Sequence, residues 1–353
     1  MSRIPQLSTT LRTALICVAD HALPRLPVVL HRGSEGSMVV AGTERWSRYL
    51  VDKFFGDSQW TSERLGACPA WGLPRILSHW RPQVDLVCGR VDQFSAARVP
   101  AADFLRAPTW IRMSAPVPAP GERPRSSQAR RNEQLVRRHG LTWRISRDPA
   151  DLATFIERDY TPYTRLRFGG TAHLRSAGWF RSRFRHGGLI WIDRGSEPVA
   201  GVLYDVSGRS LRRLAAACVR GDGELLRIGA MSATYLACLE TARTLNCDEV
   251  DLRNSRPCLT DGLVRVKQSW GGRLVPPDDV THDFLIGWHS ATPAVIRFLA
   301  DAPLVVRHAR GFSAVQADAP QPSPNPAPPG VDHVIVPEPG GRFGAWTTHA
   351  VPA

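Results

Sequence analysis

Lysine is nearly absent from this chain. Lys53 and Lys267 are the only two in 353 residues, and arginine supplies the rest of the 45 basic residues. Because acidic residues number 32, the formal net charge is +13. Such a preference for arginine is typical of a GC-rich genome, so part of the charge reflects codon usage. A surplus of this size favours polyanionic partners, and both nucleic-acid contact and a generally solvated basic surface stay open.

Common catalytic and metal-binding motifs are missing as well. The sequence has no phosphate-binding P-loop, no G-x-S-x-G, no C-x-x-C and no H-E-x-x-H. The eleven histidines are dispersed and show no metal-ligand spacing. We therefore expect no metal and no tightly bound cofactor.

Long apolar runs are also lacking. The patch Ala14–Ala19 is closed by Asp20 and His21, which makes it too short for a signal peptide core or a bilayer span. The cysteines are odd in number and scattered, as expected of reduced thiols: Cys17, Cys68, Cys88, Cys218, Cys238, Cys247 and Cys258. The sequence thus predicts a cytoplasmic protein without a membrane span.

The most informative stretch lies between residues 211 and 272. Leu211–Val219 predicts a buried strand, Leu225–Cys247 a helix with an apolar stripe, and Glu249–Leu252 a second buried strand. Strand, helix, strand in this order favours a parallel or mixed sheet covered by the helix. We expect a turn at Arg253–Pro257 and then a strand-like segment that ends near Lys267.

Residues in this stretch resemble the FemAB-like and CelD-like branch of the GNAT acyltransferase superfamily. The matching positions are Ala242 to Asn246, Asp251-Leu252, Ser255-Arg256-Pro257, Asp261-Gly262-Leu263, Lys267, Trp270 and Gly271. Upstream, Asp193, Gly195 and Pro198–Gly201 resemble the central hairpin of the same superfamily. The resemblance implies an α/β fold, α+β layered, with a GNAT-like mixed sheet, covering helices and two GNAT-like lobes.

The resemblance, together with the composition of the linker and the tail, divides the chain into five segments. We expect an N-terminal GNAT-like lobe (1–112), a linker rich in proline and alanine (113–125), a catalytic lobe (126–275), a C-terminal extension (276–315) and a proline-rich disordered tail (316–353). Within the first lobe the patterns predict strands at 26–30, 37–40 and 84–88 and a helix at 43–55. In the catalytic lobe they predict a strand at 141–145, a helix from Pro149 to Tyr160 and a hairpin of strands 188–193 and 198–204.

A basic amphipathic helix is expected at 126–139, with Ser126 or Ser127 as its cap and Gly140 as its end. Its arginines are candidates for a phosphate-facing surface that would bind tRNA or CoA: Arg130, Arg131, Arg137 and Arg138. A solvated helix face explains the same pattern.

The segment Tyr160–Gly170 combines two tyrosines, two arginines and a pair of glycines, which is more typical of a loop at a site than of a plain connection. We expect Arg165 and Arg167 to hold a phosphate or carboxylate, and Tyr160 or Tyr163 to hydrogen-bond a substrate. The alternative is that the tyrosines cap the core.

In acetyl-CoA-using members of the superfamily, a glycine-rich loop after the central strand holds the pyrophosphate through backbone amides. Here Arg220 and Gly223 stand at positions of that loop, but Leu225 replaces a small residue. Asp222 and Glu224 would also repel a pyrophosphate. The resemblance therefore fits FemAB-like members better than acyl-CoA-dependent ones.

Lys267 is the first candidate for the positive charge that stabilises an oxyanion, since its match to the family implies contact with the acyl group or the donor phosphate. Asp251 and Asp261 are candidates for accepting the amine's proton or for orienting Arg256. An Asp at the end of the strand is equally well explained as a cap of the Arg253–Pro257 turn. The resemblance places Arg256 and Trp270 with the substrate-binding residues.

These observations predict N-acyl transfer from an activated donor to a small amine or hydroxylamine acceptor. Aminoacyl-tRNA is the favoured co-substrate, and tRNA would then be a partner. The first alternative is an acyl-CoA-dependent acyltransferase of the same superfamily. The second is a nucleic-acid-binding protein that keeps the scaffold without catalysis.

Overall fold

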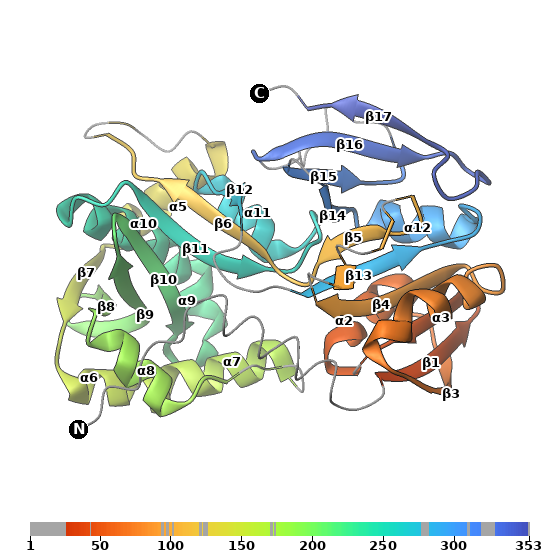
Figure 1. The fold of residues 1–353 in the computed structure, drawn as a ribbon. Coiled ribbons are helices and arrows are strands. Elements are labelled where there is room, and N and C mark those ends of the chain that lie inside the picture. Colours follow the sequence, from red (N-terminus) through yellow and green to blue (C-terminus); the bar gives the residue numbers. More distant parts are fainter. Residues whose placement is uncertain are drawn as a thin grey trace. The chain divides into compact units, whose positions relative to one another are not determined.

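The computed structural model describes residues 26–42, 44–92, 95–96, 99–100, 102–119, 122, 126–169, 172, 174–276, 282–308, 311–318 and 329–351. The chain forms two compact units (Figure 1). The first unit comprises residues 1–111, 255–265 and 274–353, and the second unit comprises residues 112–254 and 266–273. The second unit thus begins close to the predicted catalytic lobe, but residues 255–265 belong to the first.

The first unit contains two sheets. Its six-stranded sheet has the order β3-β1-β2-β4-β13-β5, and its four-stranded sheet has the order β14-β15-β16-β17. The strands are β1 (Leu26–Gly33), β2 (Gly36–Ala41), β3 (Trp60–Cys68), β4 (Leu86–Asp92), β5 (Leu105–Pro108), β13 (His282–Gly287), β14 (Leu304–His308), β15 (Gly311–Val315), β16 (Val331–Pro337) and β17 (Trp346–Ala350). Its helices include α2 (Glu44–Phe55), α3 (Leu73–Trp80) and α12 (Pro293–Asp301).

Alternation along the strands of the six-stranded sheet gives it two apolar faces. Met38 and Val40 of β2 belong to one core cluster with Phe54 of α2 and Phe298 of α12. Val39, between them in sequence, belongs to a second cluster that includes residues of α3. Both faces of this sheet are therefore covered by helices.

The second unit is built on a seven-stranded sheet of order β12-β6-β11-β10-β9-β8-β7. Its strands are β6 (Ile111–Pro116), β7 (Leu141–Ser146), β8 (Gly187–Arg194), β9 (Glu197–Ser207), β10 (Ser210–Cys218), β11 (Glu249–Ser255) and β12 (Arg273–Val275). The helices are α5 (Ser127–Arg138), α6 (Pro149–Thr154), the π-helical turn η2 (Phe155–Tyr160), α7 (Thr161–Phe168), α8 (Ala177–Phe184), α9 (Gly223–Arg227), α10 (Ala230–Thr244) and α11 (Gly262–Ser269), the last shared with the first unit.

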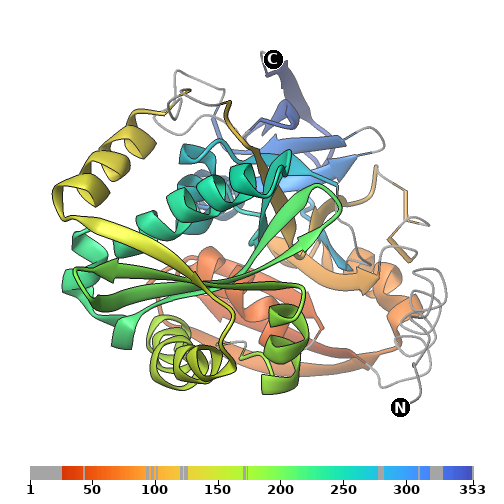
Figure 2. The same ribbon diagram turned by 90° about the vertical axis from the view of Figure 1, so that its left-hand side faces the viewer.

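Helices cover both faces of this sheet. α10 crosses one face, with α5 beside it, and α6, η2 and α8 pack on the other (Figure 2). The hairpin of β8 and β9 turns at Gly195, whose φ of 64° lies in the left-handed region that glycine adopts without strain. The mixed α/β architecture with covering helices confirms the fold class expected from the sequence.

Several predicted elements differ from the structure. The long helix at 225–247 is two helices, α9 and α10, because Gly229 adopts a φ of 91° between them. β11 continues through the predicted turn as far as Ser255, and the strand-like segment before Lys267 is helix α11. The predicted site loop after Tyr160 is helix α7.

The ends of the predicted segments differ as well. β6 occupies the start of the expected linker, and β16 and β17 form in the segment expected to be disordered. Thr43, the first residue of the helix predicted at 43–55, lies outside the described residues. Among the helices that the structure describes, none combines the length and the apolar character that a membrane crossing requires.

Candidate active site

The central feature of the second unit is the point where β10 and β11 separate. The two strands pair in parallel only from Ser210 to Arg212 on β10 and from Glu249 to Asp251 on β11. Beyond this point β10 continues to Cys218 and β11 to Ser255. The register between β10 and β9 also shifts between Arg213 and Ala215, which marks a bulge. The strands therefore diverge where β10 changes course.

Arg213 is the first residue of β10 beyond the paired segment. Its Nη2 donates a hydrogen bond to Thr234 Oγ1 at 2.9 Å, and its guanidinium lies 4.1 Å from the centre of the Tyr235 ring. Its Nε is buried without a hydrogen-bond partner, and no ion pair joins Arg213 to a carboxylate within the described residues. A half-buried cation of this kind is costly unless it has a role, which marks it as a candidate site residue.

Trp270 packs on the ring of Tyr235, the same ring that Arg213 contacts. Its ring is parallel to that of Tyr235, with the ring centres 5.9 Å apart, and only 4% of its surface is exposed. The indole Nε1 is buried and lacks a partner among the residues that the structure describes. Trp270, predicted to bind substrate, is thus a buried neighbour of the ring that positions Arg213.

Asp251 lies at the end of the paired segment of β11, and its side chain is fully buried. Oδ2 accepts hydrogen bonds from Nε and Nη2 of Arg112, at 3.1 and 3.0 Å, and from Nη1 of Arg253 at 2.9 Å. Oδ1 accepts from the backbone N–H of Arg253 at 2.7 Å. Although burial alone would raise the pKa of Asp251, the guanidiniums of Arg253 and Arg112 and the backbone hydrogen bond hold it below its usual value.

The role of Asp251 follows from this environment. A carboxylate that is ionised and held by two guanidiniums is a weak proton acceptor. Its bond to the backbone of Arg253 also supports the left-handed conformation of that residue, whose φ is 61°. Asp251 therefore fixes the backbone at the point where β11 leaves β10, and its predicted part in proton transfer stays untested.

A second buried carboxylate, Asp205, lies on β9, the strand that pairs with β10 on the side away from β11. Asp205 of β9 faces Arg212 of β10, which donates two hydrogen bonds to it at 2.6 Å, and Arg183 of α8 lies 3.4 Å away. Since Arg212 also lies opposite Asp251 in the register, acidic and basic side chains alternate across β9, β10 and β11. The paired segment is thereby fixed by charged groups on one face.

Lys267 lies on helix α11 and is 3% exposed. Its Nζ donates hydrogen bonds to the carbonyl oxygens of Arg253 and Asn254, at 3.0 and 2.8 Å. These carbonyls belong to the part of β11 that has separated from β10. Lys267 therefore holds the end of β11 in place, and its predicted contact with the acyl group stays untested.

The carboxyl end of β10 leads into a tight turn at 219–221, where Arg220 has a φ of 52°. The next residue but one, Asp222, caps α9 by accepting a hydrogen bond from the backbone N–H of Glu224 at 2.7 Å. Burial and the charges of Asp222 and Asp159 raise the pKa of the Cys218 thiol to about 12. The backbone N–H of Glu224, in the first turn of α9, is thus already bound to the Asp222 carboxylate.

Helix α7 packs against this turn. A side chain at Gly221 would meet Leu166 of α7 and lie near the backbone of Tyr163. The Tyr163 hydroxyl accepts a hydrogen bond from Nη1 of Arg167 at 3.3 Å. The structure thus brings α7, which carries Tyr163 and Arg167, against the turn that contains Arg220 at the carboxyl end of β10, and their predicted roles in binding stay untested.

Tyr160 and Arg165 are placed differently. Tyr160 packs on Phe155 and Phe180 in the core, with ring centres 6.2 and 4.9 Å away, and burial raises the pKa of its hydroxyl. Tyr160 is thus buried in the core, and its predicted hydrogen bond to a substrate stays untested. The side chain of Arg165 is exposed.

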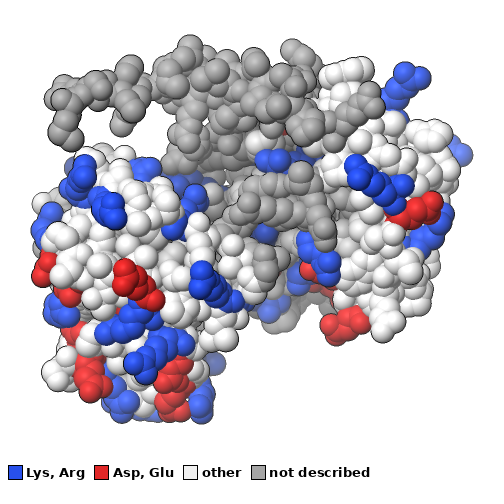
Figure 3. All heavy atoms as spheres, turned by 90° about the horizontal axis from the view of Figure 1, so that it is seen from below, with Lys and Arg blue, Asp and Glu red and all other residues white. Residues whose placement is uncertain are grey.

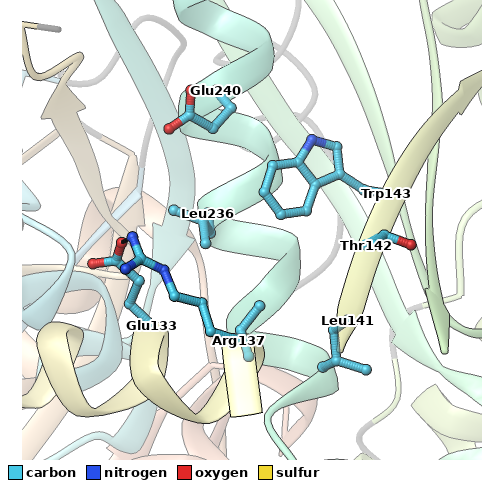
Figure 4. Close-up of a pocket in the computed structure, with 8 residues that line it drawn as sticks. Glu133, Arg137, Leu141, Thr142, Trp143, Leu236 and Glu240 are labelled. Atoms are coloured by element: carbon cyan, nitrogen blue, oxygen red, sulfur yellow. Dashed lines mark hydrogen bonds and ion pairs between the residues drawn. The ribbon is translucent and has the colours of Figure 1, made fainter. Parts of the chain in front are cut away.

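Helix α5 has the expected cap, because Ser126 accepts a hydrogen bond from the backbone N–H of Ala129 at 2.9 Å. The four predicted arginines of α5 are exposed: Arg130, Arg131, Arg137 and Arg138. Arg137 forms an ion pair with Glu133 beside a hollow of about 400 Å³ between α5, α10 and β7 (Figure 4). Glu240 of α10 also lines this hollow, so its charge is mixed.

Basic and acidic side chains are also interspersed elsewhere. On the face shown in Figure 3, Lys and Arg side chains outnumber Asp and Glu but lie among them and form no single continuous patch there. Surface charge of this kind leaves both the nucleic-acid partner and the solvated surface as hypotheses.

Arg256 and Asp261 belong to the first unit. The guanidinium of Arg256 lies between two aromatic rings, 5.0 Å from the centre of Tyr49 and 4.3 Å from that of Trp110, and burial lowers its pKa. Asp261 accepts a hydrogen bond from the backbone N–H of Leu263 at 2.8 Å and so caps the start of α11. The predicted part of Asp261 in proton transfer or in orienting Arg256 stays untested.

The described part of the chain contains no cluster of three or more His, Cys, Asp or Glu side chains arranged to hold a metal ion. Arg213, by contrast, is a candidate that sequence patterns missed. The available signal was the pair Arg212-Arg213 inside an otherwise apolar strand. Charged residues within a buried strand need partners, and only the structure distinguishes Arg212, which has one, from Arg213.

No family model matches the chain, and no curated protein matches it. Among solved structures, the chain is similar to FemX at 11% identity, over 80% of this chain and 92% of that chain, with a TM-score of 0.38. It is similar to L-PGS from Bacillus licheniformis at 11% identity, over 73% and 79%, with a TM-score of 0.33. A GCN5-related N-acetyltransferase from Sphaerobacter thermophilus matches at 14% identity, over 73% and 74%, with a TM-score of 0.34. Since these likenesses are low, the function has to be argued from the residues of this chain.

Proposed function

We propose that the second unit transfers an acyl group from an activated donor to an amine or hydroxylamine acceptor, with aminoacyl-tRNA as the favoured donor. The observation that carries this proposal is the divergence of β10 and β11 beside Arg213, whose guanidinium has no carboxylate partner among the described residues. The resemblance of the central hairpin and of the following strands to the acyltransferase superfamily supports the same chemistry.

A separated pair of strands suits an extended substrate. Backbone groups along a strand that has lost its neighbour can bind an extended chain, as an added strand would. An acyl donor that enters between β10 and β11 would then present its carbonyl close to the bulge after Arg213. A fixed guanidinium is an effective partner for the negative charge that develops on that oxygen during attack.

The reaction forms one bond and breaks another. The acceptor nitrogen attacks the acyl carbonyl, and a C–N bond forms as the ester C–O bond of the aminoacyl-tRNA breaks. The nitrogen loses a proton, and the leaving ribose hydroxyl gains one. With an acyl-CoA donor the broken bond would be C–S, and the leaving group would be a thiol.

Charge near the end of β10 supports the choice of donor. Asp222 and Glu224 are exposed acidic residues at the start of α9, where the pyrophosphate of CoA would need positive or neutral surroundings. The exposed arginines of α5 suit the repeated phosphates of an RNA backbone. Tyr163 and Arg167, beside the end of β10, are candidates for contact with the acceptor.

The test is a direct assay of donor and acceptor. The purified protein would be given labelled aminoacyl-tRNA and acetyl-CoA in parallel, each with a panel of amines and hydroxylamines. Arg213→Gln removes the positive charge at the point where the strands separate. We expect kcat to fall about 100-fold or more, as it does when a hydrogen-bond donor that stabilises an oxyanion is removed. The control is Arg209→Gln, because Arg209 is exposed, pairs with Asp248 and lies before the paired segment.

The outcomes separate the candidates. Transfer from aminoacyl-tRNA that depends on Arg213 supports the proposal. If acetyl-CoA alone reacts, acyl transfer stands, but the donor is an acyl-CoA and not an aminoacyl-tRNA. If neither donor reacts and the protein binds RNA equally well with either variant, acyl transfer is refuted and the non-catalytic nucleic-acid-binding alternative takes its place.

A further inference from the structure

A second hollow lies within the first unit, on one face of its six-stranded sheet. It has a volume of about 380 Å³, within the range of ligand pockets. Alternation along the strands directs Val29 and His31 of β1 toward it, together with Trp60, Ser62 and Arg64 of β3. Helix α2 lines the other side with Ser47, Arg48 and Val51.

The lining divides into an apolar part and a polar part. Pro27, Val29, Val40 and Val51 supply apolar surface next to Trp60. His31, Ser47, Arg48, Ser62 and Arg64 supply basic and hydroxyl groups, and no carboxylate is among the lining residues that the structure describes. A pocket that is apolar on one side and basic on the other fits a ligand with an apolar body and an anionic head.

Part of this wall is already fixed. The Trp60 ring stacks on Phe55 with ring centres 5.3 Å apart, and the Arg48 guanidinium lies 5.0 Å from the Trp60 ring. Arg48 also donates a hydrogen bond to Asp52 at 2.7 Å. Both of these neighbours of Trp60 belong to α2. They hold the Trp60 ring in one orientation, so this wall of the hollow is formed before any ligand binds.

Arg64 differs from the other cations in this region. Within the described residues no ion pair joins it to a carboxylate, and its side chain is exposed. Its neighbour Glu63 points to the other face of β3 and pairs with Arg32 at 3.5 Å. The charge of Arg64 is therefore uncompensated at the rim of the hollow.

We propose that this hollow binds a small anionic ligand with an apolar body and a carboxylate or phosphate head. The apolar body contacts Val29, Val51 and the edge of Trp60. The anionic head lies at the rim, where Arg64 binds it and the Ser62 hydroxyl, which is 2.9 Å from His31 Nδ1, donates or accepts a hydrogen bond. The site lies within the first unit and is independent of acyl transfer in the second.

The test uses three related probes. 3-Phenylpropionate and phenyl phosphate carry the two anionic heads, and 3-phenylpropionamide is the neutral control. Each probe is titrated into the full-length protein and its binding is measured by calorimetry. At least one of the two anionic probes should bind about tenfold or more tightly than the neutral amide. A difference between the two acids identifies the preferred head.

Two variants assign the binding to this hollow. Arg64→Gln should weaken binding of the acid about tenfold and leave binding of the amide unchanged, because only the acid uses the guanidinium. Val29→Phe should fill the apolar part and weaken both ligands. The matched control is Arg32→Gln, which removes an exposed arginine from the opposite face of the adjoining strand.

The proposal would be overturned if the acids bound no better than the amide, if Arg64→Gln and Arg32→Gln had the same effect, or if no probe bound at millimolar concentration. Melting temperatures of the variants close to that of the parent protein would show that any loss of binding is local and does not arise from unfolding.

Discussion

Replacing Lys267 by methionine tests whether this residue acts through structure or through chemistry. The change leaves the carbonyl oxygens of Arg253 and Asn254 without their buried donor. An unsatisfied buried acceptor costs about 1–3 kcal/mol, so about 2–6 kcal/mol is the upper range for this pair, because both hydrogen bonds are only partly buried and Asn254 is exposed. Because methionine is apolar and fills a similar volume, part of this loss is offset, and we expect a destabilisation of about 3 kcal/mol.

The assay is thermal unfolding beside acyl transfer. For a domain of the size of the second unit, each kcal/mol lowers the melting temperature by about 2–4 °C, so Lys267→Met should lower it by about 6–12 °C. Lys53→Met is the control, because Lys53 is the other lysine of the chain and lies half-buried in the last turn of α2. A surface change of that kind should shift stability by less than about 0.5 kcal/mol.

An unchanged melting temperature for Lys267→Met would refute the structural argument. If transfer were then lost while stability was kept, Lys267 would contact the reacting groups, as the resemblance implies. If both were kept, the two hydrogen bonds would contribute nothing measurable.

Three further predictions follow from the described contacts. The pKa of Asp251 is lower in the folded state than in the unfolded state. Its contribution to stability is therefore present above the unfolded pKa of about 3.9 and is lost as the pH falls through the folded pKa. We expect Asp251→Asn to reduce the loss of stability at acidic pH, as measured by unfolding over a pH series. Gly229→Ala should destabilise the protein by about 1–2 kcal/mol, since φ is 91° and the new methyl would lie 3.2 Å from Leu135, and the midpoint of urea unfolding measures this. Burial raises the pKa of the Cys238 thiol to about 12, so iodoacetamide at pH 8 should leave it unmodified until the protein is unfolded, and mass spectrometry of the labelled peptide detects either result.

Local patterns in the sequence predicted much of the second unit correctly. The strand at 211–219, the parallel pairing with the strand that starts at Glu249, and the hairpin that turns at Gly195 are all present. These elements were predictable because alternation, apolar stripes and turn residues act over a few neighbouring positions. The cap of α5 by Ser126 is of the same kind.

The errors fall where local and tertiary preferences differ. The segment of α11 resembles a strand in sequence because Val264 and Val266 are β-branched residues that favour strands. In the folded chain the cap by Asp261 and the buried contacts of Lys267 stabilise a helix instead. α7 was mistaken for a loop because its tyrosines and arginines suggest function before they suggest a helix.

The composition, the strand–helix–strand order and most elements of the central sheet were determined by the sequence itself, since each depends on neighbours along the chain. The divergence of β10 from β11, the commitment of Asp251 and Lys267 to β11, and the lack of a carboxylate partner for Arg213 were decided by the tertiary structure. Each of these depends on which distant residues meet. Arg212 and Arg213 are adjacent and chemically identical, and only the fold gives one a buried carboxylate and the other an aromatic ring.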